Sequence, residues 1–157
     1  MRMEAERKQI ILPMEEILGQ MAQAFDQGGS YCLVVTGWSM SPTLKPGRDM
    51  VRLVSPRGRK LRRGDLVFAR RRQGGFMLHR VVKCLPGGGA VLNGDGQTWL
   101  EPVDDILALA DAIRRKGKWI PVSHPVYRIY VFFWFFTRPV RGILVRVKRM
   151  LRGGRLR

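Results

Sequence analysis

The stretch Val34–Leu53, VVTGWSMSPTLKPGRDMVRL, joins two short apolar and β-branched runs, residues 31–36 and 50–54, through a segment rich in turn-forming residues. Short runs of this kind, bounded by Gly and Pro, are typical of β-strands. Ser39 and Met40 lie where the first run gives way to the turn. A serine before a methionine carries no meaning alone, so its context must come from the rest of the chain.

The alternation of short β runs and turns continues along the chain. Three further strands are predicted over residues 66–70, 77–83 and 90–92. The spacers SPRGRKLRRGD, RRQGG, LPGGG and NGDGQ are rich in Gly, Pro and charge. This pattern predicts a compact, mostly antiparallel β domain. Residues 104–115 fit either a short helix or a final strand, because ILALADAI suits both.

An amphipathic helix is predicted before the first strand, over Pro13–Phe25. Pro13 suits the first turn, and Gly28 and Gly29 end the helix. Its apolar residues recur at helical spacing: Met14, Ile17, Leu18, Met21 and Phe25. The predicted fold is therefore mainly β with an N-terminal helix, α+β overall. The residues before the helix lack a sustained apolar run, so we expect neither a secretory signal nor an anchor there.

The net charge of +17 is unevenly distributed over the 157 residues. Residues 1–111 hold 16 Lys and Arg against 12 Asp and Glu, a net of +4, whereas residues 112–157 hold 13 Lys and Arg and no acid. A chain of this length has room for one core-bearing domain with appendages. The basic C-terminal part should associate with an anionic partner, either phospholipid headgroups or nucleic acid.

The C-terminal segment, residues 121–157, combines aromatic and basic residues. Its longest charge-free stretch, Ile129–Thr137, is nine residues, whereas a bilayer-spanning helix needs about 20. On a helical wheel the apolar residues Phe132, Phe136, Val140, Ile143, Val147 and Leu151 face away from the basic residues Arg138, Arg141, Lys148, Arg149 and Arg152. This pattern predicts cationic helices lying in a membrane interface, the second beginning near Pro139. Packing on the β domain and nucleic-acid binding are the alternatives.

The two cysteines, Cys32 and Cys84, are too far apart for a CxxC motif, and no His/Cys cluster has metal-ligand spacing. We predict that both are small buried hydrophobic residues, with a disulfide as the alternative. No metal or cofactor is implied.

Nucleophilic chemistry at a serine needs a base within hydrogen-bond reach. The chain has two histidines: His79, inside the predicted strand FMLHRVVKC, and His124, in a connector before the basic tail. A lone histidine in a strand is more often structural than catalytic. The neighbouring motifs change that balance for His79.

Several blocks occur in an order that resembles the S24/S26 peptidase superfamily, in particular type I signal peptidases. The blocks are GWSMSPTL (residues 37–44) with a Gly and an Asp shortly after, RRGDLVFAR (62–70), LHRVV (78–82) and NGD (93–95). The resemblance covers roughly half the chain, from Val34 to about Asp111. It is specific as an ordered set and weak for any single block.

The resemblance implies a signal-peptidase/LexA-like β domain over residues 31–120, between an N-terminal helix in residues 1–30 and the basic tail. It implies that Ser39 is the nucleophile. Bacterial signal peptidases have a lysine base where this chain has His79, whereas the archaeal and endoplasmic-reticulum type has a histidine. The chain is thus similar to the histidine branch, in which neutral His79 would accept the serine proton.

The resemblance implies that the acid of the site is Asp95, which matches the family's Gly-Asp and would orient the imidazole or brace the site. A plain turn between strands is the structural alternative for Asp95. Histidine-type enzymes can use a second acid further on, so Glu101, Asp104 and Asp105 stay open. Lys83 is the fallback base, and oxyanion donors are expected from the Ser39 amide and the Ser41 hydroxyl.

The chain departs from type I signal peptidases in lacking a transmembrane helix before the serine, so we expect a cytoplasmic protein, peripheral at the membrane. Arg48 also separates Gly47 from Asp49, which the family often has adjacent. The predicted function is a serine endopeptidase acting on a peptide or protein precursor. The alternative is a non-catalytic basic protein that binds membrane surfaces or nucleic acid.

Overall fold

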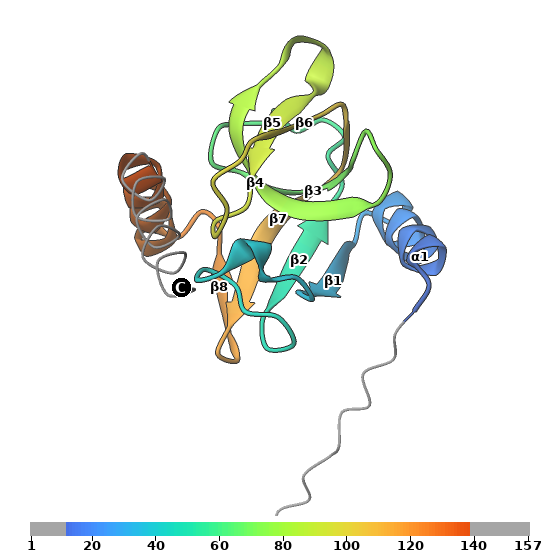
Figure 1. Ribbon diagram of the computed structural model, residues 1–157. Coiled ribbons are helices and arrows are strands. Elements are labelled where there is room, and N and C mark those ends of the chain that lie inside the picture. The colour runs from blue at the N-terminus through green and yellow to red at the C-terminus, as the bar shows by residue number, and fades with distance from the viewer. Residues whose placement is uncertain (1–11, 139–157) are drawn as a thin grey trace, which may run out of the picture.

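Eight strands form one antiparallel sheet within residues 12–138, the part of the chain that the computed structural model describes (Figure 1). The strands are β1 (Ser30–Val34), β2 (Met50–Val54), β3 (Leu66–Arg70), β4 (Phe76–Cys84), β5 (Ala90–Asn93), β6 (Glu101–Val103), β7 (Asp105–Arg115) and β8 (Lys118–Pro121). Their order is β1-β2-β7-β3-β4-β5-β6, and β8 pairs with β7. The mainly β, α+β architecture expected from the sequence is confirmed.

The long strand β7 connects the two halves of the sheet. It pairs with β2 and β3, and the register shifts once along each pairing, between Arg52 and Leu53 and between Phe68 and Ala69. Such bulges bend a strand and increase its twist, which lets a single sheet curl around apolar residues on its concave side. The segment 104–115, which fitted a helix or a strand, thus contains the strand β7 that joins the two halves of the sheet.

The predicted N-terminal helix is present as α1 (Met14–Asp26), shifted by one residue so that Pro13 is its N-cap, and it packs beside β1 (Figure 1). Its buried Met21 joins a core cluster that also contains Met40, Leu44 and Tyr127. Burial of this apolar stripe, rather than intrinsic propensity, is what stabilises a helix of this length. A second cluster lies between β3, β4, β5 and β7 around Val67, Val81 and Leu92, among others.

The C-terminal helix is described over residues 125–138 and appears in orange at the side of the sheet away from α1 (Figure 1). His124 caps it: its Nδ1 accepts a hydrogen bond from the Val126 amide at 3.3 Å, and its carbonyl accepts one from the Arg128 amide at 3.0 Å. Tyr127 and Trp134 are buried against the sheet. No helix in residues 12–138 is long and apolar enough to cross a bilayer. The predicted second helix near Pro139 lies outside the described residues.

The cysteine prediction was wrong in one respect. Cys32 and Cys84 are both free thiols, but both are exposed. Cys32 lies on β1, whose side chains alternate between the two faces, and it points outward between the half-buried Tyr31 and Leu33. Cys84 is the last residue of β4, where the strand leaves the core.

Candidate functional site

Ser39 lies in a short 3₁₀ turn, η1 (Trp38–Met40), that follows β1. The turn is closed by hydrogen bonds from the Ser41 amide to the Trp38 carbonyl at 3.0 Å and from the Leu44 amide to the Met40 carbonyl at 2.9 Å. Met40 is 1% exposed and anchors the turn in the core. Ser39 is only half-buried, so the turn holds a serine side chain at the edge of the core.

Ser39 and His79 line the same cavity, which has a volume of about 290 Å³. His79 lies on β4 and is 2% exposed. The cavity also contains Arg71, and its remaining wall is mostly apolar, formed by Met14, Ile17, Leu33, Val34, Val35, Thr36, Gly37, Met40, Phe68, Phe76, Met77 and Leu78. The candidate nucleophile and the candidate base, forty residues apart in sequence, therefore line one partly open cavity.

The His79 imidazole is neutral at physiological pH. Burial, and to a smaller extent the nearby Arg71 guanidinium, lowers its pKa to about 4, whereas Asp95 acts in the opposite direction. Its Nδ1 atom is buried and has no hydrogen-bond partner within residues 12–138. The imidazole is therefore in the neutral form that can accept a proton, and its low pKa makes it a weaker base than an imidazole that titrates near neutral pH.

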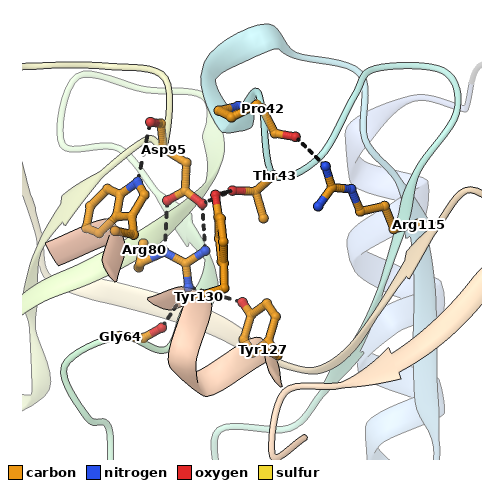
Figure 2. Close-up of polar contacts among 9 residues, drawn as sticks. Pro42, Thr43, Gly64, Arg80, Asp95, Arg115, Tyr127 and Tyr130 are labelled. Carbon is orange, nitrogen blue, oxygen red and sulfur yellow. Dashed lines mark hydrogen bonds and ion pairs between the residues drawn. The ribbon is translucent and has the colours of Figure 1, made fainter. Parts of the chain in front are cut away.

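Asp95 is directed at Arg80, the residue after His79 (Figure 2). The Arg80 Nη2 and Nε atoms donate to the two carboxylate oxygens of Asp95 at 2.6 and 2.8 Å, and both side chains are fully buried. Consecutive residues of a strand point to opposite faces, and β4 pairs regularly with β3 here. The carboxylate thus lies across β4 from His79, and these contacts fit the bracing role better than orientation of Nδ1.

The C-terminal helix completes the network around Arg80 and Asp95 (Figure 2). The Arg80 Nη1 atom donates to the Tyr127 hydroxyl at 3.1 Å, and the Trp134 indole donates to the Asp95 carbonyl at 3.4 Å. Thr43 donates to the Asp95 carboxylate and also shares a hydrogen bond with Tyr130. Because Thr43 follows the serine turn, the network connects that turn, β4 and the helix.

The turn that contains Asp95 also packs directly on the serine turn. The Gly96 amide donates to the Ser39 carbonyl at 2.8 Å. A Cβ atom at Gly94 would lie 2.6 Å from the Ser39 carbonyl oxygen, and one at Gly96 would lie 2.6 Å from the Ser41 carbonyl oxygen. Only glycine permits so close an approach of two backbones, which explains why a glycine lies on each side of Asp95 in the NGDG sequence.

The alternative acids each pair with one of three consecutive arginines. Glu101 lies 3.4 Å from Arg71, Asp104 2.7 Å from Arg72 and Asp105 3.3 Å from Arg70. Of these arginines, Arg71 lines the cavity with His79. Glu101 is therefore connected to the site through Arg71, whereas the other two pairs are half-exposed ion pairs on the surface.

The fallback base Lys83 does not line the cavity. The register of β4 against β5 shifts between Val81 and Lys83, which breaks the regular alternation that would place Lys83 on the same face as His79. Lys83 is exposed. The proposed oxyanion donor Ser41 directs its hydroxyl at the Leu44 carbonyl, at 3.5 Å.

Two residues of the site were not anticipated from the sequence, Arg71 and Arg80. Arg80 was part of the LHRVV block, but its side chain is completely buried. The sequence did not predict this burial, because an arginine in a strand usually lies on the exposed face. Arg71 lies within Arg70-Arg71-Arg72, and nothing in that run distinguishes the arginine that faces the cavity.

In residues 12–138, no group of three or more His, Cys, Asp or Glu is placed to hold a metal ion. A scan against models of known protein families, a search of curated proteins and a search of solved structures each found no match.

Proposed function

We propose that this protein is a serine endopeptidase of the signal-peptidase-like S24/S26 class that cleaves a peptide bond in a peptide or protein precursor. The observation that carries the proposal is the cavity shared by Ser39 and a buried, neutral His79. The order of the sequence blocks around these two residues supports the same class.

In the proposed reaction, the Ser39 hydroxyl attacks the carbonyl carbon of the scissile bond while His79 accepts its proton. The tetrahedral oxyanion collapses, and His79 gives the proton to the leaving amine as the acyl-enzyme forms. A water molecule, deprotonated by His79, then hydrolyses the ester and restores Ser39. The Ser39 amide and the Ser41 hydroxyl are the proposed oxyanion donors.

The site works as a Ser/His dyad in this proposal, with Asp95 as a positioning residue. In the described part of the chain, the Nδ1 atom of His79 has no hydrogen-bond partner, and the Asp95 carboxylate is held by Arg80. Packing in β4, instead of a third polar group, would fix the imidazole. Asp95 acts through its own turn, whose Gly96 amide holds the Ser39 carbonyl.

The cavity wall supports a preference for an apolar side chain in the substrate. Met14 and Ile17 of α1, together with Leu33 and Phe76, provide apolar surface beside the serine turn. An extended apolar residue next to the scissile bond would bury its side chain there. Arg71 is the cationic residue among the cavity lining and disfavours a basic side chain at that position.

The proposal is tested by mass-spectrometric mapping of a fluorophosphonate probe, together with cleavage of a diverse peptide library. We expect the wild type to carry the label on Ser39 and to cleave peptides, and Ser39→Ala and His79→Ala to do neither. Loss of a general base costs about 10²–10⁴-fold in rate. Ser55→Ala, in a surface turn, and Lys83→Ala are the matched controls and should retain both signals.

Cleavage that persists in Ser39→Ala would overturn the assignment of the nucleophile. A folded wild type that neither takes the label nor cleaves any peptide would overturn the enzymatic proposal as a whole. Loss of activity in Lys83→Ala with retention in His79→Ala would place the base on lysine instead. Circular dichroism of every variant separates loss of chemistry from loss of fold.

A further inference from the structure

Five large apolar side chains are exposed on one face of the C-terminal helix. They are Val126, Ile129, Phe132, Phe133 and Phe136, each between 56% and 73% exposed. Their spacing of three, three, one and three residues places them on a single helical stripe. So large an apolar stripe on the surface of a domain marks an interaction site.

The opposite face of the same helix is fixed to the protein. Tyr127 and Trp134 are buried, and they contact Arg80 and Asp95. Val131 and Phe135 approach Gly64, where a Cβ atom would lie 3.1 and 3.6 Å from them. The helix is therefore held rigidly by its inner face, and its aromatic outer face is presented outward.

A basic groove adjoins this outer face. It has a volume of about 680 Å³ and lies between the helix and the turn that precedes β3. Its wall contains the exposed Arg62, Arg63 and Arg128 as well as Phe132 and Phe136. The Arg63 guanidinium lies 4.2 Å from the centroid of the Phe135 ring, which keeps it beside the aromatic residues.

One acid, Asp65, also lines the groove, and its carboxylate accepts a hydrogen bond from the Arg62 amide at 2.8 Å. Among the described residues that line it, three arginines against this single aspartate leave the groove positively charged. Cations thus lie beside the apolar stripe, which is the arrangement of a surface that inserts aromatic residues below anionic headgroups.

We propose that the outer face of residues 125–138 and the groove of Arg62, Arg63 and Arg128 form one docking surface for an anionic phospholipid bilayer. Phe132, Phe133 and Phe136 enter the boundary between headgroups and acyl chains, and the arginines bind lipid phosphates. The docking surface does not depend on the peptidase activity. It combines the basic turn before β3 with the outer face of the helix.

Two other occupants fit the chemistry less well. A second copy of the chain would bring the same arginines face to face, and like charges would repel. A nucleic acid would satisfy the arginines, and its bases could stack on phenylalanine, but Val126 and Ile129 offer no stacking surface. A bilayer accounts for the aliphatic, aromatic and cationic residues together.

The test is co-sedimentation of the full chain with vesicles of phosphatidylcholine, and with vesicles of equal parts phosphatidylcholine and phosphatidylglycerol. We expect binding to the anionic vesicles only, weakened by salt. Phe132→Ser/Phe136→Ser should weaken it at least about ten-fold, because two phenylalanines leave the lipid. Arg62→Gln/Arg63→Gln should weaken it by about 5-fold for each arginine.

Matched controls lie on the β7–β8 hairpin. Trp119→Ser removes an exposed aromatic residue, and Lys116→Gln/Lys118→Gln removes two exposed charges; both should bind as the wild type does. The proposal would be overturned if the Phe132→Ser/Phe136→Ser and Arg62→Gln/Arg63→Gln variants both bound anionic vesicles as the wild type does. The basic sequence beyond residue 138 would then be sufficient for binding. A concentration-dependent dimer that the phenylalanine variant abolishes, without vesicle binding by the wild type, would also overturn it. The same holds for tight binding to a single-stranded oligonucleotide with no vesicle binding.

Discussion

Arg80 and Asp95 form a fully buried, bidentate ion pair on the face of β4 opposite His79, with Nη2–Oδ2 and Nε–Oδ1 distances of 2.6 and 2.8 Å. The pair binds the serine turn through Thr43 and the C-terminal helix through Tyr127. It thus connects the candidate nucleophile, the strand of the candidate base and the proposed docking helix. A buried pair is costly to desolvate, so its value here lies in fixing these three elements relative to one another.

Removal of one partner of this pair should be strongly destabilising. Asp95→Asn leaves the buried Arg80 guanidinium without a compensating charge, which typically costs about 3–5 kcal/mol in the free energy of unfolding. Urea denaturation monitored by circular dichroism measures the change. The matched control is Asp105→Asn, which breaks the half-exposed pair with Arg70 and should cost less than about 1 kcal/mol. Similar small losses in both variants would contradict the bracing role of Asp95.

The strands could be predicted where apolar runs are bounded by turn residues. The bounds of β2 and β3 agree with the prediction at both ends, and those of β4 and β5 agree within one residue. β6 and β8 were missed because each is three or four residues long and contains a proline, which disfavours a strand. Their pairing partners, β5 and β7, supply the hydrogen bonds that the local sequence does not encode.

The candidate site could be predicted in part. The serine turn and His79 were found from blocks of sequence, and the structure places both on one cavity. The contacts of Asp95 could not be predicted, because they depend on which face of β4 the NGDG turn approaches. The lysine alternative depended on regular alternation along β4, which a bulge interrupts. The contacts of Asp95 and the bulge in β4 both depend on pairing between segments that are distant in sequence.

The pH dependence of the proposed activity should follow His79. Since burial and Arg71 lower its pKa to about 4, the imidazole stays neutral, and active as a base, well below the ordinary value of about 6.5. Probe labelling should therefore decline only as the pH falls through about 4. Arg71→Gln removes a repelling charge, so the acid limb should move to higher pH. Arg72→Gln, whose guanidinium pairs with Asp104 outside the cavity, should leave the limb in place. If labelling of the wild type declined near pH 6.5 instead, the buried environment assigned to His79 would be contradicted.

Asp49 should make the stability dependent on pH in the acid range. The Arg48 side chain lowers the pKa of this buried carboxyl to about 2, and the Lys45 and Lys116 amides also donate to it. A carboxyl with a depressed pKa stabilises the fold above its unfolded pKa of about 4, and this contribution is lost as the pH falls toward 2. Asp49→Asn should thus cost about 1–3 kcal/mol at pH 7 and progressively less in acid.

The control for that measurement is Asp26→Asn, which breaks an exposed pair with Arg57 and should change stability little at any pH. Thermal denaturation from pH 2 to pH 7 provides the comparison. A cost of Asp49→Asn that is equal at both ends of the range would show that the charge of Asp49 contributes nothing. The Arg48 that separates Gly47 from Asp49 would then have no role in the turn.

A change in the contact between the NGDG turn and the serine turn should lower the proposed activity. In Gly96→Ala the new Cβ atom would lie 2.6 Å from the Ser41 carbonyl oxygen, so one of the two turns must move. The Gly96 amide holds the Ser39 carbonyl at 2.8 Å, and displacement would misplace the proposed nucleophile. A misplacement of about 1 Å can cost about 10²-fold in rate.

Gly19→Ala is the matched control, because no atom of residues 12–138 lies within 4 Å of a Cβ atom at Gly19 in α1. Alanine there should raise stability by up to about 1 kcal/mol and leave probe labelling unchanged. Gly96→Ala should retain the secondary structure but lose most of the labelling. Full labelling in a folded Gly96→Ala variant would mean that Ser39 tolerates movement of its turn, and the bracing by Asp95 and Gly96 would then serve the fold alone.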